Sequence, residues 1–303
     1  MKRIFIFLLA IGLLAGCKAP TEEVDSTVES TQAPTEYTTE PSKGTAPTKS
    51  TEPIKATETT KETVTLPTTI KAEWVTKDGN TYYRQANGSY AKGKVSIDGI
   101  DYFFDKTGRQ VLVVNPWNFV PYDYSPDLVT FYDFAQYEDG NVLDKTCLDP
   151  LLEMLEDCRK AGCEVRIVSS YRRQVTQEML YNNKVDYFLQ QGYDLESARE
   201  EAGKVVAVPG TSEHQLGLAV DIIDVNYGYL DSYQAQMPAQ KWLMEHCHEY
   251  GFILRYPVGS TEITGIIYEP WHYRYVGREI AAEIHELGIC LEEYLIMLTP
   301  GVG

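Results

Sequence analysis

The chain has 303 residues, of which 43% are hydrophobic, and its formal net charge at pH 7 is -17. This length and this hydrophobic content are enough for one or two compact domains. The negative charge argues against a nucleic-acid partner, because nucleic-acid binding depends on Lys and Arg side chains that neutralise phosphates. Acidity keeps a protein soluble but says little about a peptide substrate.

The first residues have the composition of a secretory signal. Lys2 and Arg3 form a basic start, residues 4–14 form an apolar run, and Ala15 and Gly16 supply small residues at its end. The apolar run is shorter than the ~20 residues that span a membrane. Because Cys17 follows directly, the segment resembles the lipobox of bacterial lipoproteins, which implies a signal peptide over residues 1–17 and a lipidated Cys17. The alternative is an ordinary cleaved signal followed by a chance cysteine.

Five further cysteines follow, an odd number that leaves at least one thiol unpaired within an exported chain. They are Cys147, Cys158, Cys163, Cys247 and Cys290. No CxxC spacing occurs, so cysteine is not predicted as a metal ligand. A disulfide between Cys158 and Cys163 and a set of buried, inert thiols are both compatible with the sequence.

Residues 18–72 are dominated by Thr, Pro, Glu, Ser and Lys and hold almost no large apolar side chains. Such a composition cannot bury enough surface to offset the entropy of ordering, so we expect a disordered linker. Prolines stiffen a chain of this kind, which would suit a spacer behind a lipid anchor. An inert tail without a spacing role is the alternative.

Residues 73–111 contain a weak internal repeat. The run WVTKDGNTYY at 74–83 is echoed by KVSIDGIDYFF at 94–104, and each copy has an Asp-Gly turn between two short strands. This pattern predicts β-hairpins. The copies resemble the cell-wall-binding repeats of bacterial wall enzymes, which implies wall glycan or choline as a ligand. The alternative is that the aromatic side chains only pack the hairpins against each other or against the next domain.

From residue 112 onward helices and strands mix without the regular alternation of a parallel sheet. The sequence therefore predicts an α+β domain over residues 112–303, with a small antiparallel sheet flanked by helices and a single metal site. Asp149 and Pro150 mark the start of the first helix, with Pro150 at its first position. The predicted helices cover 151–161, 173–191, 199–204, 239–250 and 277–287, and the predicted strands 164–168, 218–223, 252–256 and 271–275.

Two dense motifs in this domain carry the chemistry, SEHQLGLAVD at 212–221 and EPWH at 269–272. They provide two imidazoles, His214 and His272, and two carboxylates, Asp221 and Glu269. A catalytic zinc needs three protein ligands, an open position for water and a base. A lone histidine is more often a packed or surface residue, but this grouping favours a zinc-dependent hydrolase, with Glu269 as the base.

Together the two motifs resemble the signatures of the VanY-like zinc D-alanyl-D-alanine carboxypeptidases. The residues that carry the resemblance are Ser212, His214, Gly217, Ala219 and Asp221 in the first motif and Glu269, Trp271, His272, Arg274, Tyr275, Val276 and Gly277 in the second. Further matches are LVVNP at 112–116, SSYR at 169–172 and YGFILRYP at 250–257. The resemblance implies one Zn²⁺ per chain, with His214, Asp221 and His272 as ligands and Glu269 as general base.

The same resemblance implies a substrate clamp formed by Arg172, Gln177 and Ser212. Arginine can bind a terminal carboxylate through two parallel hydrogen bonds, as an exopeptidase requires. We also expect Trp271 to pack behind the metal, and the sequence leaves open whether Tyr273 or Arg274 borders the pocket.

The resemblance implies a carboxypeptidase that removes the terminal D-alanine from peptidoglycan stem peptides, exported and lipid-anchored on the outer face of the cytoplasmic membrane, facing the cell wall. An LD-carboxypeptidase acting on the tetrapeptide and a catalytically inactive peptidoglycan-binding protein are the alternatives.

Overall fold

The computed structural model describes residues 71–122 and 124–301. The predicted signal peptide, Cys17 and nearly all of the predicted linker lie outside the described residues. Of the helices within these ranges, none is long and apolar enough to cross a membrane.

A four-stranded antiparallel sheet forms the centre of the part of the chain after residue 111, which carries both sequence motifs, in the order β10-β11-β9-β8. Its strands are β8 (Val165–Ser169), β9 (Ala219–Asp224), β10 (Phe252–Leu254) and β11 (His272–Tyr275). The predicted α+β fold with a small antiparallel sheet is confirmed. In the register of β9 and β11, Asp221 lies directly opposite His272, so the sheet itself joins the two sequence motifs.

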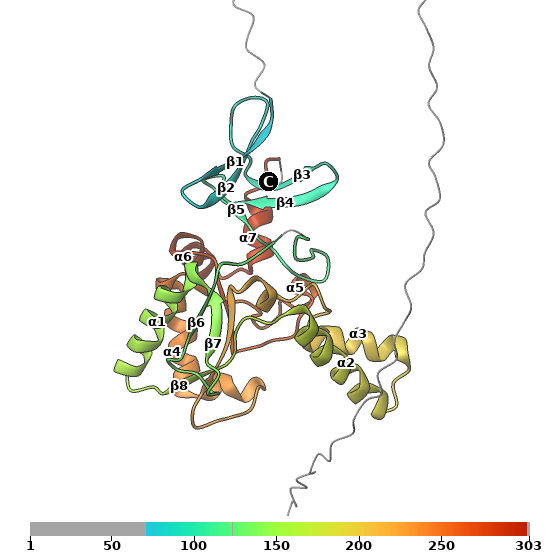
Figure 1. The fold of residues 1–303 in the computed structure, drawn as a ribbon, viewed down its shortest axis with the longest axis vertical. Helices are drawn as coiled ribbons and strands as arrows, with labels where there is room; N and C mark the ends of the chain where they lie inside the picture. Colours follow the sequence, from blue (N-terminus) through green and yellow to red (C-terminus); the bar gives the residue numbers. More distant parts are fainter. Residues whose placement is uncertain (1–70, 123, 302–303) are drawn as a thin grey trace, which may run out of the picture. The chain divides into compact units, whose positions relative to one another are not determined.

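Helices α1, α4 and α6 contact this sheet, whereas α2 and α3 pack against each other beside it and α7 packs against β3 (Gly93–Ile97) (Figure 1). The bounds of the helices are as follows. They are α1 (Lys145–Lys160), α2 (Gln174–Gln190), α3 (Leu195–Val205), α4 (Pro238–His246), α5 (Thr261–Thr264), α6 (Arg278–Leu287) and α7 (Leu291–Met297). Three 3-10 turns accompany them, η1 (Glu213–Leu216), η2 (Ser232–Gln236) and η3 (Cys247–Tyr250). The main core joins α1 and α4 to the sheet through buried side chains such as Leu151, Leu155, Ile222 and Leu243. This core holds β9 and β11 rigidly behind the motifs that they carry.

Helix α1 begins six residues earlier than the sequence predicted. Its N-cap is Asp144, whose side chain accepts a hydrogen bond from the backbone N–H of Thr146. Pro150 therefore lies inside the helix rather than at its first position. The prediction of a start at Leu151 is wrong because an Asp N-cap satisfies the free backbone donors at the earlier position. Starting at Lys145 adds about a turn and a half of helix. The cost is the one backbone hydrogen bond that Pro150 cannot donate.

A short hairpin precedes α1 and pairs β6 (Leu128–Phe131) with β7 (Asn141–Asp144), which the sequence did not predict. The backbone N–H of Asp144 donates to the carbonyl of Gly217, inside the first motif. The hairpin thus ties the start of α1 to the loop that carries His214.

The predicted hairpins are present in residues 73–111, which we call the hairpin module. They consist of β1 (Glu73–Lys77) with β2 (Asn80–Arg84), and β3 (Gly93–Ile97) with β4 (Ile100–Phe104) and β5 (Gln110–Val111). At both turns the Asp and the Gly have positive φ angles, as two-residue hairpin turns require. Trp74 packs against Tyr83 and Tyr102 with ring centroids 5.1 and 4.8 Å apart, so aromatic contacts join one hairpin to the other.

The hairpin module also shares a core with the last two helices. Phe103 and Val111 pack in one buried cluster with Ile280 of α6 and Leu295 of α7. The backbone N–H of Lys94 donates to the Thr299 hydroxyl just beyond α7, at 2.9 Å. The module and the C-terminal helices therefore form one packed unit.

Within residues 71–122 and 124–301 the cysteines form no disulfide, and all are buried except the half-buried Cys163. Burial raises the pKa of the Cys147 and Cys247 thiols to about 12. Thiols held in this way are inert, which agrees with the second of the two alternatives that the sequence left open.

Candidate metal centre

The fold brings His214, Asp221 and His272 together from three elements. His214 lies on η1, Asp221 on β9 and His272 at the start of β11. One ligand atom from each lies within 4.8 Å of the others, and all three side chains are buried. Two imidazoles and one carboxylate at this separation are a donor set that suits Zn²⁺ and leaves a position open for water or substrate.

The imidazole of His214 is oriented by the backbone. Its Nδ1 lies 2.7 Å from the carbonyl oxygen of Ser170, so Nδ1 carries the proton and donates it there. Its Nε2 lies 3.2 Å from Asp221 Oδ2 and has no hydrogen-bond partner among the described residues. A buried ring nitrogen with a free lone pair is what a metal ligand needs.

The ring of His272 is turned the other way. Its Nδ1 lies 2.9 Å from Asp221 Oδ1 and 3.9 Å from Glu269 Oε2. Nδ1 is therefore the nitrogen that points to the common centre, whereas the Nε2 points away from it. Glu269 lies three residues before His272, just ahead of β11, and its side chain lines the same cavity.

Burial and neighbouring charges separate the pKa values of these groups. Burial and the Arg172 charge lower the pKa of His214 to about 4, and burial raises that of Glu269 to about 8. Burial disfavours the charged form of His272 too, but its contacts with Asp221 and Glu213 outweigh burial and raise its pKa to about 9. Because metal ligands must be deprotonated, zinc binding would displace a proton from His272.

The candidate ligands line a cavity of about 250 Å³ together with Arg172, Ser212 and Glu269. Arg172 donates to Asp221 Oδ2 at 2.7 Å and to the Ser169 hydroxyl at 2.8 Å. Its guanidinium is thus fixed at the wall of the cavity, beside the candidate ligands.

Gln177 is fully buried and does not line the cavity itself. Its side-chain oxygen accepts from Arg172 at 3.3 Å, while its amide nitrogen donates to the carbonyl of Ala207 at 2.7 Å. Gln177 therefore helps to hold the Arg172 guanidinium in place without lining the cavity, whereas Ser212 lines the cavity directly.

The protein-family model described as "VanY: D-alanyl-D-alanine carboxypeptidase" matches residues 140–278. A D-alanyl-D-alanine carboxypeptidase of Enterococcus faecalis is 40% identical over 191 residues, which cover 63% of this chain and 67% of that protein. The chain belongs to the VanY family. The resemblance seen in the two motifs is therefore confirmed.

Solved structures agree with this VanY-family assignment. VanYB in complex with D-alanine-D-alanine is 39% identical, with a TM-score of 0.54 over 61% of this chain and 96% of that one. A variant of the D,D-pentapeptidase VanY in complex with Zn(II) is 38% identical, also with a TM-score of 0.54, over 61% of this chain and 97% of that one. The LD-carboxypeptidase LdcB is 32% identical with the same TM-score, over 67% of this chain and 92% of that one.

In this VanY-family chain neither Tyr273 nor Arg274 lines the cavity of the candidate ligands. Tyr273 lies on the opposite face of β11 and donates its hydroxyl hydrogen to Gln240 at 2.8 Å. Arg274 is buried and donates to Glu213 at 2.7 Å and to the carbonyl of Leu112 at 2.8 Å. The sequence left this question open, and neither residue borders this cavity. Trp271, expected to pack behind the metal, lines the cavity instead.

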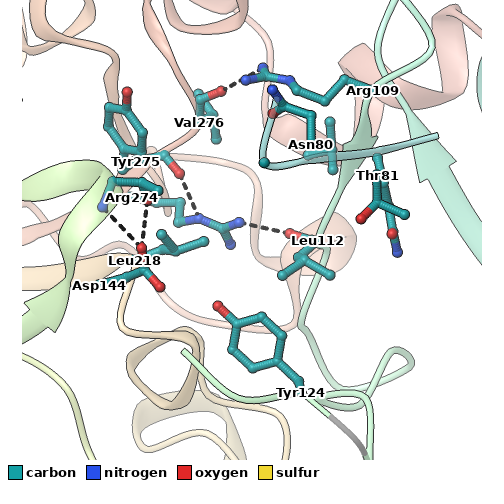
Figure 2. Close-up of a pocket in the computed structure, with 14 residues that line it drawn as sticks. Asn80, Thr81, Arg109, Leu112, Tyr124, Asp144, Leu218, Arg274, Tyr275 and Val276 are labelled. Carbon is teal, nitrogen blue, oxygen red and sulfur yellow. Dashed lines mark hydrogen bonds between the residues drawn. The ribbon is translucent and has the colours of Figure 1, made fainter. Parts of the chain in front are cut away.

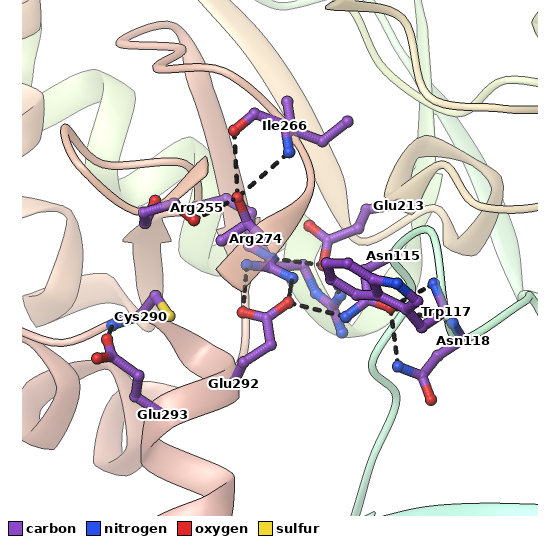
Figure 3. Close-up of polar contacts among 12 residues, drawn as sticks. Asn115, Trp117, Asn118, Glu213, Arg255, Ile266, Arg274, Cys290, Glu292 and Glu293 are labelled. Carbon is purple, nitrogen blue, oxygen red and sulfur yellow. Dashed lines mark hydrogen bonds and ion pairs between the residues drawn. The ribbon is translucent and has the colours of Figure 1, made fainter. Parts of the chain in front are cut away.

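Sequence reasoning missed a buried ionic network beside the metal centre (Figure 3). Glu213 accepts hydrogen bonds from Arg255 and Arg274, and Arg255 also pairs with Glu292 of α7. Burial opposes the charged form of Glu213, but the two guanidiniums hold its pKa below its usual range. Glu213 and Arg255 do lie in matched family motifs, but nothing in their spacing predicted that they would meet.

A second cavity, of about 400 Å³, is lined by none of the candidate ligands (Figure 2). Its walls come from Asn80 and Arg109 of the hairpin module and from Asp144, Arg274 and Tyr275. Arg109 and Arg274 donate to backbone carbonyls there. We therefore place the candidate active site in the smaller cavity, because that cavity is lined by the three candidate ligands, Glu269 and Arg172.

Proposed function

We propose that this protein is a zinc-dependent D-alanyl-D-alanine carboxypeptidase that removes the terminal D-alanine from peptidoglycan stem peptides. The observation that carries this proposal is the convergence of His214, Asp221 and His272 in one buried cavity that also holds Glu269 and Arg172. Family membership supports the same reaction, as do relatives whose names state this activity.

Zinc held by His214, Asp221 and His272 would lower the pKa of a bound water to about 7 and polarise the scissile carbonyl. Glu269 would accept the proton of the attacking water and then deliver it to the leaving amine of D-alanine. Its position, with Oε2 at 3.9 Å from His272 Nδ1, keeps its carboxylate beside the metal donors without making it one of the three.

Arg172 would bind the terminal carboxylate of the substrate. Its guanidinium is anchored by Ser169 and Gln177, and only about a fifth of its side chain is exposed (18%). A fixed, partly exposed guanidinium in the same cavity as the base favours an exopeptidase, because an endopeptidase would meet no free carboxylate there. Ser212 completes the wall of this subsite.

The length of the accepted stem peptide distinguishes the main proposal from its nearest alternative. The LD-carboxypeptidase LdcB is 32% identical to this chain. Purified zinc-loaded protein should be incubated separately with muropeptides that end in a pentapeptide and in a tetrapeptide, and the released D-alanine measured by mass spectrometry. Release from the pentapeptide supports the DD-carboxypeptidase. Release from the tetrapeptide alone would replace it with an LD-carboxypeptidase.

We also propose that the protein is exported and lipid-anchored through Cys17, and that the hairpin module binds wall glycan or choline. The signal-like start and the Cys that follows it support the anchor. The aromatic side chains of the hairpins support the binding role, although several of them pack against one another. Loss of membrane association in Cys17→Ser, with the protein still exported, would be expected for a lipid anchor.

A further inference from the structure

We infer that Glu213 is a positioning residue for the metal centre, which fixes the ring of His272 so that Nδ1 is available to the metal. Glu213 stands next to His214 in the first motif but faces the other histidine. The inference rests on the proposed zinc function, and it assigns a role to a side chain that would touch neither metal nor substrate.

Two unpaired atoms carry the inference. Glu213 Oε2 and His272 Nε2 are both buried and lack a hydrogen-bond partner among the described residues, and they lie 3.6 Å apart. Glu213 Oε2 can accept a hydrogen bond and His272 Nε2 can donate one, so each can satisfy the other, and a buried polar atom without a partner is costly. A slight rotation of the His272 ring would bring the two atoms within hydrogen-bond distance.

The other oxygen of Glu213 is already saturated. Its Oε1 accepts from Arg255 Nε at 2.8 Å and from Arg274 Nη1 at 2.7 Å. Arg255 is itself held by Glu292, with Nη1 and Nη2 at 2.9 and 2.6 Å from the two carboxylate oxygens. These ion pairs hold the carboxylate of Glu213 in place (Figure 3). Its other oxygen, Oε2, is the one that lies 3.6 Å from His272 Nε2.

This arrangement selects one tautomer of His272. A carboxylate oxygen can only accept, so Glu213 Oε2 requires the proton on Nε2. Asp221 Oδ1 is also an acceptor, 2.9 Å from Nδ1, and zinc held by Asp221 and His272 would take the lone pair of Nδ1 in place of a proton. Nδ1 is the nitrogen that faces Asp221 and Glu269. The two histidines are thus oriented by different partners, a backbone carbonyl for His214 and a carboxylate for His272. Carboxylate partners of this kind fix the ring and raise the basicity of the ligand.

Glu213→Gln tests this role with almost no change in shape. Because Arg255 and Arg274 must face the amide oxygen, the NH₂ group takes the place of Oε2 and points a donor at His272 Nε2. That donor favours the opposite tautomer, with the proton on Nδ1. We expect the zinc Kd, measured by competition with a chromophoric chelator, to rise ten- to hundredfold.

The matched control is Glu292→Gln. It weakens the same ionic network, but Glu292 pairs with Arg255 and does not face His272. It should lower thermal stability while leaving the zinc Kd close to that of the wild type. Equal losses of zinc affinity in the two variants, or wild-type affinity in a folded Glu213→Gln protein, would overturn the inference.

A measurement on the unaltered protein covers the case in which Glu213→Gln does not fold. Nitrogen NMR of the histidine rings in the zinc-loaded protein should show His272 protonated at Nε2 and His214 protonated at Nδ1. Metal bound to Nε2 of His272 would refute the role of Glu213. Neither experiment uses turnover, so a zinc-binding protein without carboxypeptidase activity would refute the proposed function and leave this inference intact.

Discussion

At the residue scale, the site depends on which atoms its buried side chains leave free. Nε2 of His214 lacks a partner, whereas Nδ1 of the same ring is bound to a carbonyl. The residue types of the ligands and the base could be predicted from the two motifs, because zinc chemistry restricts them. The orienting partners could not, since Ser170 and Glu213 become neighbours of the rings only through the fold.

Glu269→Gln tests the general base. The amide keeps the shape of the side chain but cannot accept the proton of the attacking water, so kcat should fall roughly 10²- to 10⁴-fold. Bound zinc, measured by metal analysis, should stay at the wild-type level because Glu269 is not one of the three clustered donors. Glu262→Gln, at an exposed position on α5, is the control. Unchanged kcat in Glu269→Gln would exclude Glu269 as the base and favour another catalytic group.

Arg172→Lys tests the carboxylate clamp. Lysine keeps the positive charge but loses the two-pronged geometry, so kcat/KM should fall roughly ten- to hundredfold, as expected for a lost hydrogen bond to a charged group. The adjacent Arg173→Lys variant provides the control, because Arg173 is exposed. If the two variants have equal kcat/KM on the pentapeptide, Arg172 does not bind the carboxylate.

At the scale of elements, the sequence predicted most helices and strands of the catalytic part but not how they pair. Periodicity identified α2, β9 and β11 to within two residues, whereas α7 and the β6–β7 hairpin were missed. α7 is only seven residues long, and its role is tertiary, because it carries Glu292 to Arg255. The register that places Asp221 opposite His272 arises from sheet packing, which no local pattern encodes.

Glu292 should make stability depend on acid pH. Burial raises its pKa, but Arg255 outweighs burial and lowers the pKa below the usual 4.5. The unfolded chain therefore takes up the proton first, so the stabilisation is complete at neutral pH and is lost as the pH falls below about 5. Glu292→Gln should lower the free energy of unfolding at pH 7 by about 1.5–3 kcal/mol, and the difference should shrink towards pH 3.

Urea unfolding of the wild type and Glu292→Gln at several pH values measures this difference. Glu286→Gln removes an exposed carboxylate on α6 with the same change of charge and should show no such dependence. A difference between the wild type and Glu292→Gln that stays constant down to pH 3 would contradict the assigned ion pair.

At the scale of the whole molecule, the hairpin module and the catalytic part share a core. The sequence predicted the hairpins from their Asp-Gly turns, but it placed a boundary at residue 112 because the repeat ends there. Composition could not reveal that Phe103 and Val111 pack against α6 and α7. A repeat of two copies has too little core of its own, which explains why it shares one with its neighbour.

Phe103→Ala tests this shared core. Removing a buried aromatic side chain should cost about 3–5 kcal/mol and should shift the unfolding of the whole chain as one transition. Ile100→Ala, at an exposed position on the same strand, should have little effect (59% exposed). Tryptophan fluorescence reports on both parts, through Trp74 in the module and Trp242 on α4. Two well-separated transitions would mean that the module unfolds on its own.

The central claim, a zinc-dependent D-alanyl-D-alanine carboxypeptidase, is tested most directly by returning zinc to metal-stripped protein in the presence of a pentapeptide muropeptide. The rate of D-alanine release should be abolished by stripping and should rise linearly with added zinc to a plateau at one equivalent per chain. Release that is unaffected by stripping, or no release with one zinc verified as bound, would contradict the account.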